Sequence, residues 1–221
     1  MTSLKQHFYN VRKKLYNLST HFGYNYNLKI YDNEFFKENK LEGLKMAGWF
    51  IPALQKVVGF HSLADIGCGT GHYLKYCLEN GITDVFGLEG SPHAFESLAV
   101  DKKFVVMHDL RKPYAFNRKW NVAISIEVAE HVDRLYTNNY IKILTDASDT
   151  VVLTAAQPGQ GGTAHVNEQK PEWWKKQFAR VNFTLDEART KALKSEIHQA
   201  EISGKFVTIW FEPNVLVFKR R

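Results

Sequence analysis

The sequence predicts an α/β fold built on a doubly wound, mainly parallel β-sheet, and three observations lead to that prediction. Short apolar runs alternate with helical patterns between residues 62 and 156, which is typical of a parallel sheet with helices on both faces. A glycine-rich segment follows the first apolar run, at residues 65–71. A last apolar run follows a long excursion, at residues 215–219. We therefore expect seven strands, with an antiparallel C-terminal strand at one edge.

The first 60 residues predict helices rather than strands. Apolar side chains recur at steps of three and four residues at Leu4, Phe8, Val11, Leu15 and Leu18. This spacing is typical of an amphipathic helix. A second helix is expected after Asp32, a residue that caps helices well. We therefore divide the chain into an N-terminal helical segment, residues 1–60, and a core domain, residues 61–221.

Within the core domain, five apolar runs have the length and flanking turn residues of buried strands. They lie at residues 62–66, 85–88, 104–107, 122–126 and 149–156. Helices are expected where apolar residues take helical spacing or where a hydroxyl cap precedes proline, as at Ser91. They are expected after residue 71, after Ser91, and at 134–147, 171–180 and 185–199.

Composition excludes several classes of protein. The chain has 221 residues, of which 44% are hydrophobic and 24% charged, so it is globular rather than disordered. No apolar run approaches the ~18–20 residues of a membrane helix, and the N-terminus lacks the apolar core of a signal peptide. Two cysteines, Cys68 and Cys77, suggest neither a disulfide framework nor a thiolate zinc site. We expect a cytoplasmic protein.

The net charge of +6 is unevenly distributed. Residues 61–169 carry 9 basic and 13 acidic side chains, a balance of −4, whereas residues 1–60 and 170–221 carry +5 each. A positive net charge favours an anionic binding partner. This uneven distribution of charge predicts an acidic site surrounded by a basic rim. The basic rim would favour an anionic acceptor such as a phosphorylated or nucleotide-linked sugar, or RNA.

The strongest local signal is Asp65-Ile-Gly67-Cys-Gly69-Thr-Gly71, between a predicted strand and a helix. Glycines at such a junction permit a tight turn and let a ligand approach the backbone. The following helix N-terminus offers free N–H groups to a carboxylate or phosphate. A dinucleotide fingerprint would need a glycine at position 72, which is His72, so a nicotinamide or flavin enzyme fits poorly.

This arrangement resembles motif I of the class I S-adenosylmethionine (SAM) methyltransferases. Glu89 ends the second predicted strand, Asp109 ends the third, and Ser125-Ile-Glu127-Val-Ala-Glu130-His131-Val after the fourth resembles the family's post-strand-four motif. The resemblance covers residues 31–219. The alternative is a Rossmann-like domain with an incidental glycine loop, but four motifs in register favour the family.

The resemblance implies SAM as cofactor and a set of residues that bind it. Glu89 is expected to accept the ribose hydroxyls and Asp109 the adenine amino group. Residues 1–60 would then form a lid over the cofactor. The cofactor-binding residues implied by the resemblance are Asp65, Gly67, Cys68, Gly69, Gly71, Glu89, Asp109, Leu110, Ile126 and Tyr31.

A second segment resembles a narrower group of these enzymes. The glycine-rich loop Pro158-Gly-Gln-Gly-Gly162, the following His165-Val-Asn-Glu168 and Trp173-Trp174 are similar to a bacterial and phage subfamily, some members of which are associated with sugar modification. The resemblance to this subfamily implies a sugar-like class of acceptor and no particular molecule.

Glu127, Glu130, His131 and His165 are the candidates for chemistry at the acceptor. An alcohol acceptor must lose a proton, to a base or with the help of a metal. The resemblance extends to metal-dependent ubiquinone-pathway O-methyltransferases and small-RNA 2′-O-methyltransferases, which implies that these four residues hold Mg²⁺ or another divalent cation. His165, His131 and Glu127 are the expected catalytic residues. Alternatively, Glu130 and His131 only cap a helix and His165 only binds backbone.

Three functions follow, and the sequence leaves them open. The first is methylation of a hydroxyl group on a sugar, nucleotide-sugar or similar small molecule. The second is 2′-O-methylation of RNA ribose, which the basic flanks and metal motif favour, although no RNA-binding module is evident. The third is a non-catalytic SAM-binding domain, against which the intact Asp65, Glu89 and Asp109 argue.

Overall fold

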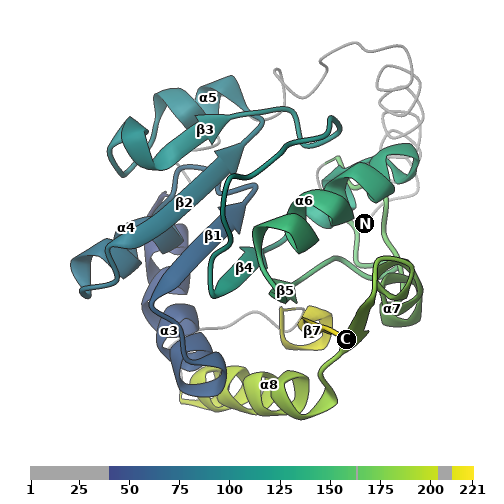
Figure 1. The fold of residues 1–221 in the computed structure, drawn as a ribbon. Helices are drawn as coiled ribbons and strands as arrows, with labels where there is room; N and C mark the ends of the chain where they lie inside the picture. The colour runs from purple at the N-terminus through teal and green to yellow at the C-terminus, as the bar shows by residue number, and fades with distance from the viewer. Residues whose placement is uncertain (1–39, 163, 204–210) are drawn as a thin grey trace, which may run out of the picture.

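Five parallel strands form the larger part of a single sheet in the structure, a computed structural model that describes residues 40–162, 164–203 and 211–221 (Figure 1). Their residues are mostly buried, as expected for strands covered on both faces. They are β1 (Ser62–Ile66), β2 (Asp84–Glu89), β3 (Val105–Met107), β4 (Val122–Ser125) and β5 (Thr150–Leu153). β1 pairs with β2 and β4, β2 also pairs with β3, and β4 with β5, all in parallel.

The sheet ends in two antiparallel strands. β7 (Leu216–Arg220) pairs antiparallel with β5, and β6 (Phe183–Leu185) pairs antiparallel with β7. The order of strands is β3-β2-β1-β4-β5-β7-β6 among the described residues. The predicted seven-stranded, mainly parallel sheet with an antiparallel edge is confirmed. The C-terminal strand is antiparallel as expected, and the three-residue β6, which the sequence did not predict as a strand, lies outside it at the edge.

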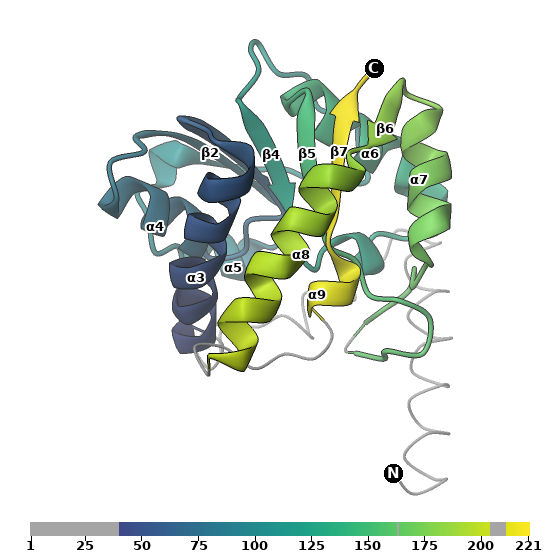
Figure 2. The same cartoon turned by 90° about the horizontal axis from the view of Figure 1, so that it is seen from below.

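Helices cover both faces of the sheet (Figure 2). α3, α4 and α8 pack on one face, where α3 contacts both α4 and α8, and α6 and α7 pack on the other. The helices are α3 (Lys40–Val58), α4 (His72–Glu79), α5 (Pro92–Glu96), α6 (Thr137–Ala147), α7 (Pro171–Ala179), α8 (Glu187–Ile202) and α9 (Phe211–Asn214). Single 3₁₀ turns occur at Lys102–Phe104, Ala129–His131 and Arg134–Tyr136.

Two apolar clusters, one on each face, hold these layers together. Phe50 and Leu54 of α3 are fully buried on one face. On the other, the rings of Phe178 and Phe218 stack at 3.9 Å between centroids, and both are fully buried. Burying each such ring contributes on the order of 1.5–3 kcal/mol. The sheet that carries the site is therefore packed on both faces by buried apolar side chains.

A close approach of α3 to α4 depends on a glycine. A Cβ at Gly43 would lie 2.1 Å from Nδ1 of His72, the first residue of α4. Only glycine lets the imidazole pack against the α3 backbone at this point. The N-terminus of α4, which follows the glycine loop, therefore packs directly against α3.

The predicted helices at 134–147, 171–180 and 185–199 correspond to α6, α7 and α8 within a few residues. The helix predicted after Ser91 exists but is only five residues long, with Ser91 as its N-cap. The helices expected in residues 1–39, and with them most of the predicted lid, lie outside the described residues. Among the described residues, no helix is both long and apolar enough to cross a membrane.

Candidate active site

The loop between β1 and α4 takes the backbone shape that its glycines permit. Gly67, Gly69 and Gly71 have φ values of 81°, 54° and 79°, a region that side chains with a Cβ rarely adopt. A Cβ at Gly67 would lie 2.6 Å from two methyl carbons of Val128, whereas a Cβ at Gly69 would meet nothing within 4 Å. The loop is therefore packed on one side and open at Gly69, where a ligand can reach the backbone.

Glu89 ties this loop to the end of β2. Its Oε2 accepts a hydrogen bond of 2.6 Å from the backbone N–H of Gly69, and its Oε1 accepts one of 2.6 Å from Ser91. Burial raises the pKa of the Glu89 carboxyl, although the hydrogen bonds from Ser91, Gly69 and Gly90 oppose that effect. The carboxylate thus contacts Gly69, the open position of the loop, and its role at the cofactor stays a prediction.

Asp65, at the end of β1, has an unsatisfied acceptor. The residue is 1% exposed, and its Oδ2 has no hydrogen-bond partner among the described residues. Burial, and then the charge of Glu89, raise the pKa of this carboxyl well above its ordinary value. A buried acceptor without a donor is costly, so a ligand that brings a cationic or N–H donor fits this position.

Asp109 follows β3 and is already paired within its own turn. Its two carboxylate oxygens accept hydrogen bonds of 2.8 Å from Nε and Nη2 of Arg111, and its Oδ1 accepts one of 3.0 Å from the Arg111 backbone. Burial acts to raise the pKa of Asp109, but these bonds and the charge of Arg111 outweigh it and hold the pKa below its ordinary value. The neighbouring Leu110 is buried.

Glu127 lies just beyond β4, in a strained backbone conformation. Its φ is 55°, which is uncommon for a residue other than glycine and typical of functional sites. Its backbone N–H donates to Oγ1 of Thr154 at 2.7 Å, and its Oε1 accepts a 3.5 Å bond from Nδ2 of Asn214. Burial raises the pKa of its carboxyl. The preceding Ile126 is half-buried.

Glu130, His131 and His165 form a cluster beside Glu127. One ligand atom of each lies within 4.8 Å of those of the other two, and the two imidazole rings are 4.9 Å apart. Both oxygens of Glu130 are buried and accept no well-aligned hydrogen bond from a donor among the described residues. The carboxyl of Glu127 lies within hydrogen-bonding reach of the Glu130 carboxyl. Burial, and then the charge of Glu127, raise the pKa of Glu130 well above its ordinary value. Burial and then His165 lower the pKa of His131 to about 4.

The loop that carries His165 packs back onto this cluster. The backbone N–H groups of Val166 and Asn167 donate to the carbonyl of Glu130 at 2.8 and 3.0 Å. The carbonyl of Ala164 lies 3.3 Å from Nδ1 of His131. These contacts bring residues separated by more than thirty positions to one place at the carboxyl ends of β4 and β5.

Comparison with known protein families identifies the family to which this chain belongs. A family model described as a methyltransferase domain matches residues 33–174, more than half of the chain. This chain belongs to the methyltransferase domain family. The glycine loop, Glu89 and the cluster at Glu130 all lie within the matched segment. The expectation of a class I methyltransferase is thereby supported, whereas the narrower subfamily stays a prediction.

Solved methyltransferases share this fold. The sugar N-methyltransferase KedS8 from Streptoalloteichus matches with a TM-score of 0.60 and 14% identity, over 85% of this chain and 92% of that one. The plantazolicin methyltransferase BpumL matches with 0.60 and 14%, over 100% of both chains. The magnesium protoporphyrin IX methyltransferase from Synechocystis matches with 0.53 and 14%, over 80% of both. Comparison with curated proteins found no match. These identities support the fold alone.

The methyltransferase domain brings together three of the four predicted metal ligands. Glu130, His131 and His165 lie in the cluster, and Glu127 lies outside it, although its charge influences the pKa of Glu130. Cys68 is buried within the glycine loop. Tyr31 lies outside the described residues, so its predicted role at the cofactor stays a prediction.

Three residues of the methyltransferase domain were missed by sequence reasoning. Glu168 accepts a hydrogen bond from the backbone of Gly159 in the glycine-rich loop. Asn214 donates a hydrogen bond to the Glu127 carboxylate, and the Arg111 guanidinium donates one to the Asp109 carboxylate. The three-residue spacing of His165 and Glu168 and the two-residue spacing of Asp109 and Arg111 are visible in the sequence. Asn214 gave no signal, because it reaches the site only through the fold.

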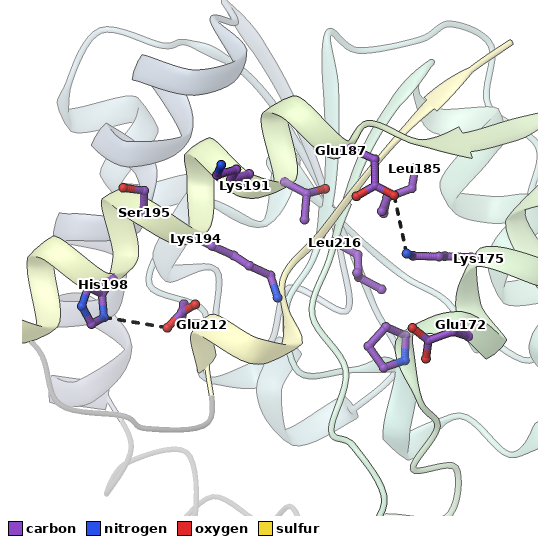
Figure 3. A pocket seen from close by; sticks show the side chains of 12 residues that line it. Glu172, Lys175, Leu185, Glu187, Lys191, Lys194, Ser195, His198, Glu212 and Leu216 are labelled. Carbon is purple, nitrogen blue, oxygen red and sulfur yellow. Dashed lines mark ion pairs between the residues drawn. The ribbon is translucent and has the colours of Figure 1, made fainter.

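A separate groove of about 660 Å³ opens between α7, α8 and β7 (Figure 3). It contains none of the predicted site residues. Lys175, Lys191 and Lys194 line it together with three glutamates, and Lys175 pairs with Glu187 at 3.6 Å. The groove is thus mixed in charge, not a uniformly cationic surface.

Proposed function

We propose that this methyltransferase domain transfers a methyl group from SAM to a hydroxyl group of a small molecule, such as a sugar or a nucleotide-sugar. The observation that carries the proposal is the buried cluster of Glu130, His131 and His165. Methylation of a thiol or an amine needs little more than alignment of donor and acceptor. An alcohol must also lose a proton, and this cluster has the groups for that purpose.

The cofactor side of the site suits SAM. Its electrophilic methyl group sits on a cationic sulfonium, and its amino acid end carries an ammonium. The unpartnered Oδ2 of Asp65 offers an acceptor to such a cationic group, and the open space at Gly69 admits a ligand against the backbone. Glu89 would accept the ribose hydroxyls, because a carboxylate is an acceptor with several lone pairs.

On the acceptor side, His165 is the proposed base. The acceptor oxygen would form its bond to the methyl carbon as the carbon–sulfur bond breaks, and the hydroxyl proton would pass to His165. Glu127 would orient the acceptor, since Thr154 and Asn214 hold it at the end of β4. His131, whose pKa is lowered to about 4, stays neutral near pH 7 and would accept or donate a hydrogen bond without adding charge.

The same cluster fits a divalent cation. Two imidazoles and a carboxylate form a donor set that suits Mn²⁺, Fe²⁺ or Zn²⁺ better than Mg²⁺, which prefers oxygen ligands. The buried oxygens of Glu130, which accept no hydrogen bond from a well-placed donor among the described residues, favour a cation. Nδ1 of each histidine already lies near an oxygen, of Ala164 for His131 and of Glu168 for His165, as is usual behind metal ligands. A bound cation would lower the pKa of the acceptor hydroxyl. In that case His165 would hold the cation instead of acting as the base, and the hydroxyl proton would leave to solvent.

Calorimetry and a chelator test the two halves separately. S-adenosylhomocysteine should bind, and Glu89→Ala should weaken that binding by about 10–100-fold because charged hydrogen bonds are lost. Glu96→Ala, an exposed residue on α5, is the matched control. An unchanged affinity in the Glu89 variant would contradict its assignment.

Methyl transfer to a panel of sugars and nucleotide-sugars should fall by at least ~100-fold in EDTA and return with Mn²⁺, Fe²⁺ or Zn²⁺ rather than with Mg²⁺. Full activity in EDTA would remove the cation and leave His165 as the base. If the acceptor is RNA instead, binding should weaken steeply with salt, and the sugar panel should stay unmethylated.

A further inference from the structure

Glu168 contacts the loop at residues 157–168, which we call the acceptor loop, at three points. Its Oε2 accepts a hydrogen bond of 3.1 Å from the backbone N–H of Gly159, and its Oε1 accepts one of 3.1 Å from Gly161. Nδ1 of His165 lies 3.2 Å from the same Oε1. The Glu168 side chain is only 10% exposed, so this buried carboxylate is surrounded by its donors rather than by water.

The glycines make this arrangement possible. Gly159 and Gly161 have φ values of 91° and 71°, and such turns can direct backbone N–H groups toward one anion. On the other side of the imidazole, a Cβ at Gly162 would lie 2.3 Å from Nε2 of His165. The ring thus has the Glu168 carboxylate at Nδ1 and, beside Nε2, a glycine whose missing Cβ leaves space.

We infer that Glu168 is a positioning residue for His165, an inference that rests on the proposed role of His165 at the acceptor. By accepting from Nδ1, Glu168 keeps the imidazole proton on that nitrogen and leaves Nε2 as the basic or metal-binding atom. By accepting from Gly159 and Gly161, it holds the loop against the ends of β4 and β5. The Glu168 carboxylate thereby links the conformation of the loop to the tautomer of His165.

The wild-type protein alone makes the inference testable. Nitrogen-15 NMR of labelled histidine should show His165 with its proton on Nδ1 at neutral pH. Amide hydrogen exchange should show protection at Gly159 and Gly161, although they lie in a loop. A proton on Nε2 of His165, or unprotected amides at both glycines, would overturn the inference without any substitution.

Glu168→Gln sharpens the test, because the amide presents N–H donors where the carboxylate only accepted. Exchange at Gly159 and Gly161 should become at least about tenfold faster, and the Nδ1–H tautomer of His165 should lose population. Glu172→Gln, an exposed residue on α7 with the same change in charge, should alter neither.

Binding of S-adenosylhomocysteine serves as the check on folding and on the proposed function. It should be unchanged in Glu168→Gln, because the cofactor loop is separate from this contact. Unaltered exchange and tautomer in that variant would overturn the positioning role. Failure of the wild-type protein to bind S-adenosylhomocysteine would instead overturn the proposed function and leave the Glu168 contacts intact.

Discussion

The loop at residues 67–71 and the loop at residues 157–168 both depend on glycines with positive φ, yet different contacts hold them. The cofactor loop is tied by Glu89 and by the carbonyl of Leu88, both from the neighbouring strand β2. The acceptor loop is held by side chains from its own far end, Glu168, and from α9, where Asn214 donates to Oε1 of Gln160 at 3.0 Å.

The two sets of contacts show that the sequence specifies the two loops in different ways. The proposed cofactor half, the loop at residues 67–71 with its flanking elements, needs one strand–loop–helix unit and the strand beside it, so a short motif specifies it. The acceptor half needs the completed fold to bring its partners together. Substitutions should therefore act on stability and ligand binding differently in the two halves.

The largest effect is expected from Gly67→Ala, which attacks the locally encoded half. Alanine at φ 81° costs about 1–2 kcal/mol, and its Cβ would collide with Val128, which adds about 1–3 kcal/mol of overpacking. The free energy of unfolding, measured in urea, should fall by about 3 kcal/mol.

Gly81→Ala is the matched control, because Gly81 has φ 85° and open space at the Cβ position. It should cost only the backbone part. Adding Val128→Ala should recover stability in the Gly67 variant relative to the sum of the two single changes. Equal losses at Gly67 and Gly81 would show that the contact with Val128 carries no weight.

A smaller effect, confined to the other half, is expected from Asn214→Ala. The buried Asn214 amide donates to Gln160 and accepts from Nε2 of Gln157 at 3.4 Å. Losing these bonds should destabilise the loop locally by about 1–2 kcal/mol, which proteolysis or hydrogen exchange at residues 157–162 would reveal. Affinity for S-adenosylhomocysteine should not change.

Asn138→Ala, an exposed position on α6, is the control for that substitution. Weaker S-adenosylhomocysteine binding in the Asn214 variant would mean that the two halves are coupled. The contrast between a local and an assembled half would then need revision.

The smallest effect concerns the Asp109–Arg111 pair and acid. Because the folded pKa of Asp109 lies below its ordinary value of 3.8, its contribution to stability is present above that value. It is lost as the pH falls through the lower, folded value. Both side chains are partly exposed, so the contribution should stay below about 1 kcal/mol.

Arg111→Gln should remove this contribution and flatten the dependence of urea midpoints on pH below 3.8. Arg118→Gln, which breaks the more exposed pair with Asp84, should leave that part of the curve unchanged. The same acid slope in the wild type and the Arg111 variant would be evidence against the pair.

Sequence patterns predicted the alternating core well, because buried parallel strands are continuous apolar runs and the helices between them place apolar side chains at helical spacing. They missed β6, since three residues at an edge form a strand only once β7 is beside them. They found the cluster of Glu130, His131 and His165 through residue type. They did not find Asn214, the last residue of α9, because nothing local in the sequence distinguishes it from any other asparagine.

The place of β7 inside the sheet has a consequence for synthesis of the chain. Its residues, from Leu216 on, pair with β5, which ends at Leu153, and also with β6. While the chain between them is being made, the edge of β5 is open and β6 has no neighbour. Such non-local pairing is slow to form, and an open edge is a site for association with other chains. We expect nascent chains that stop before residue 216 to be prone to aggregation.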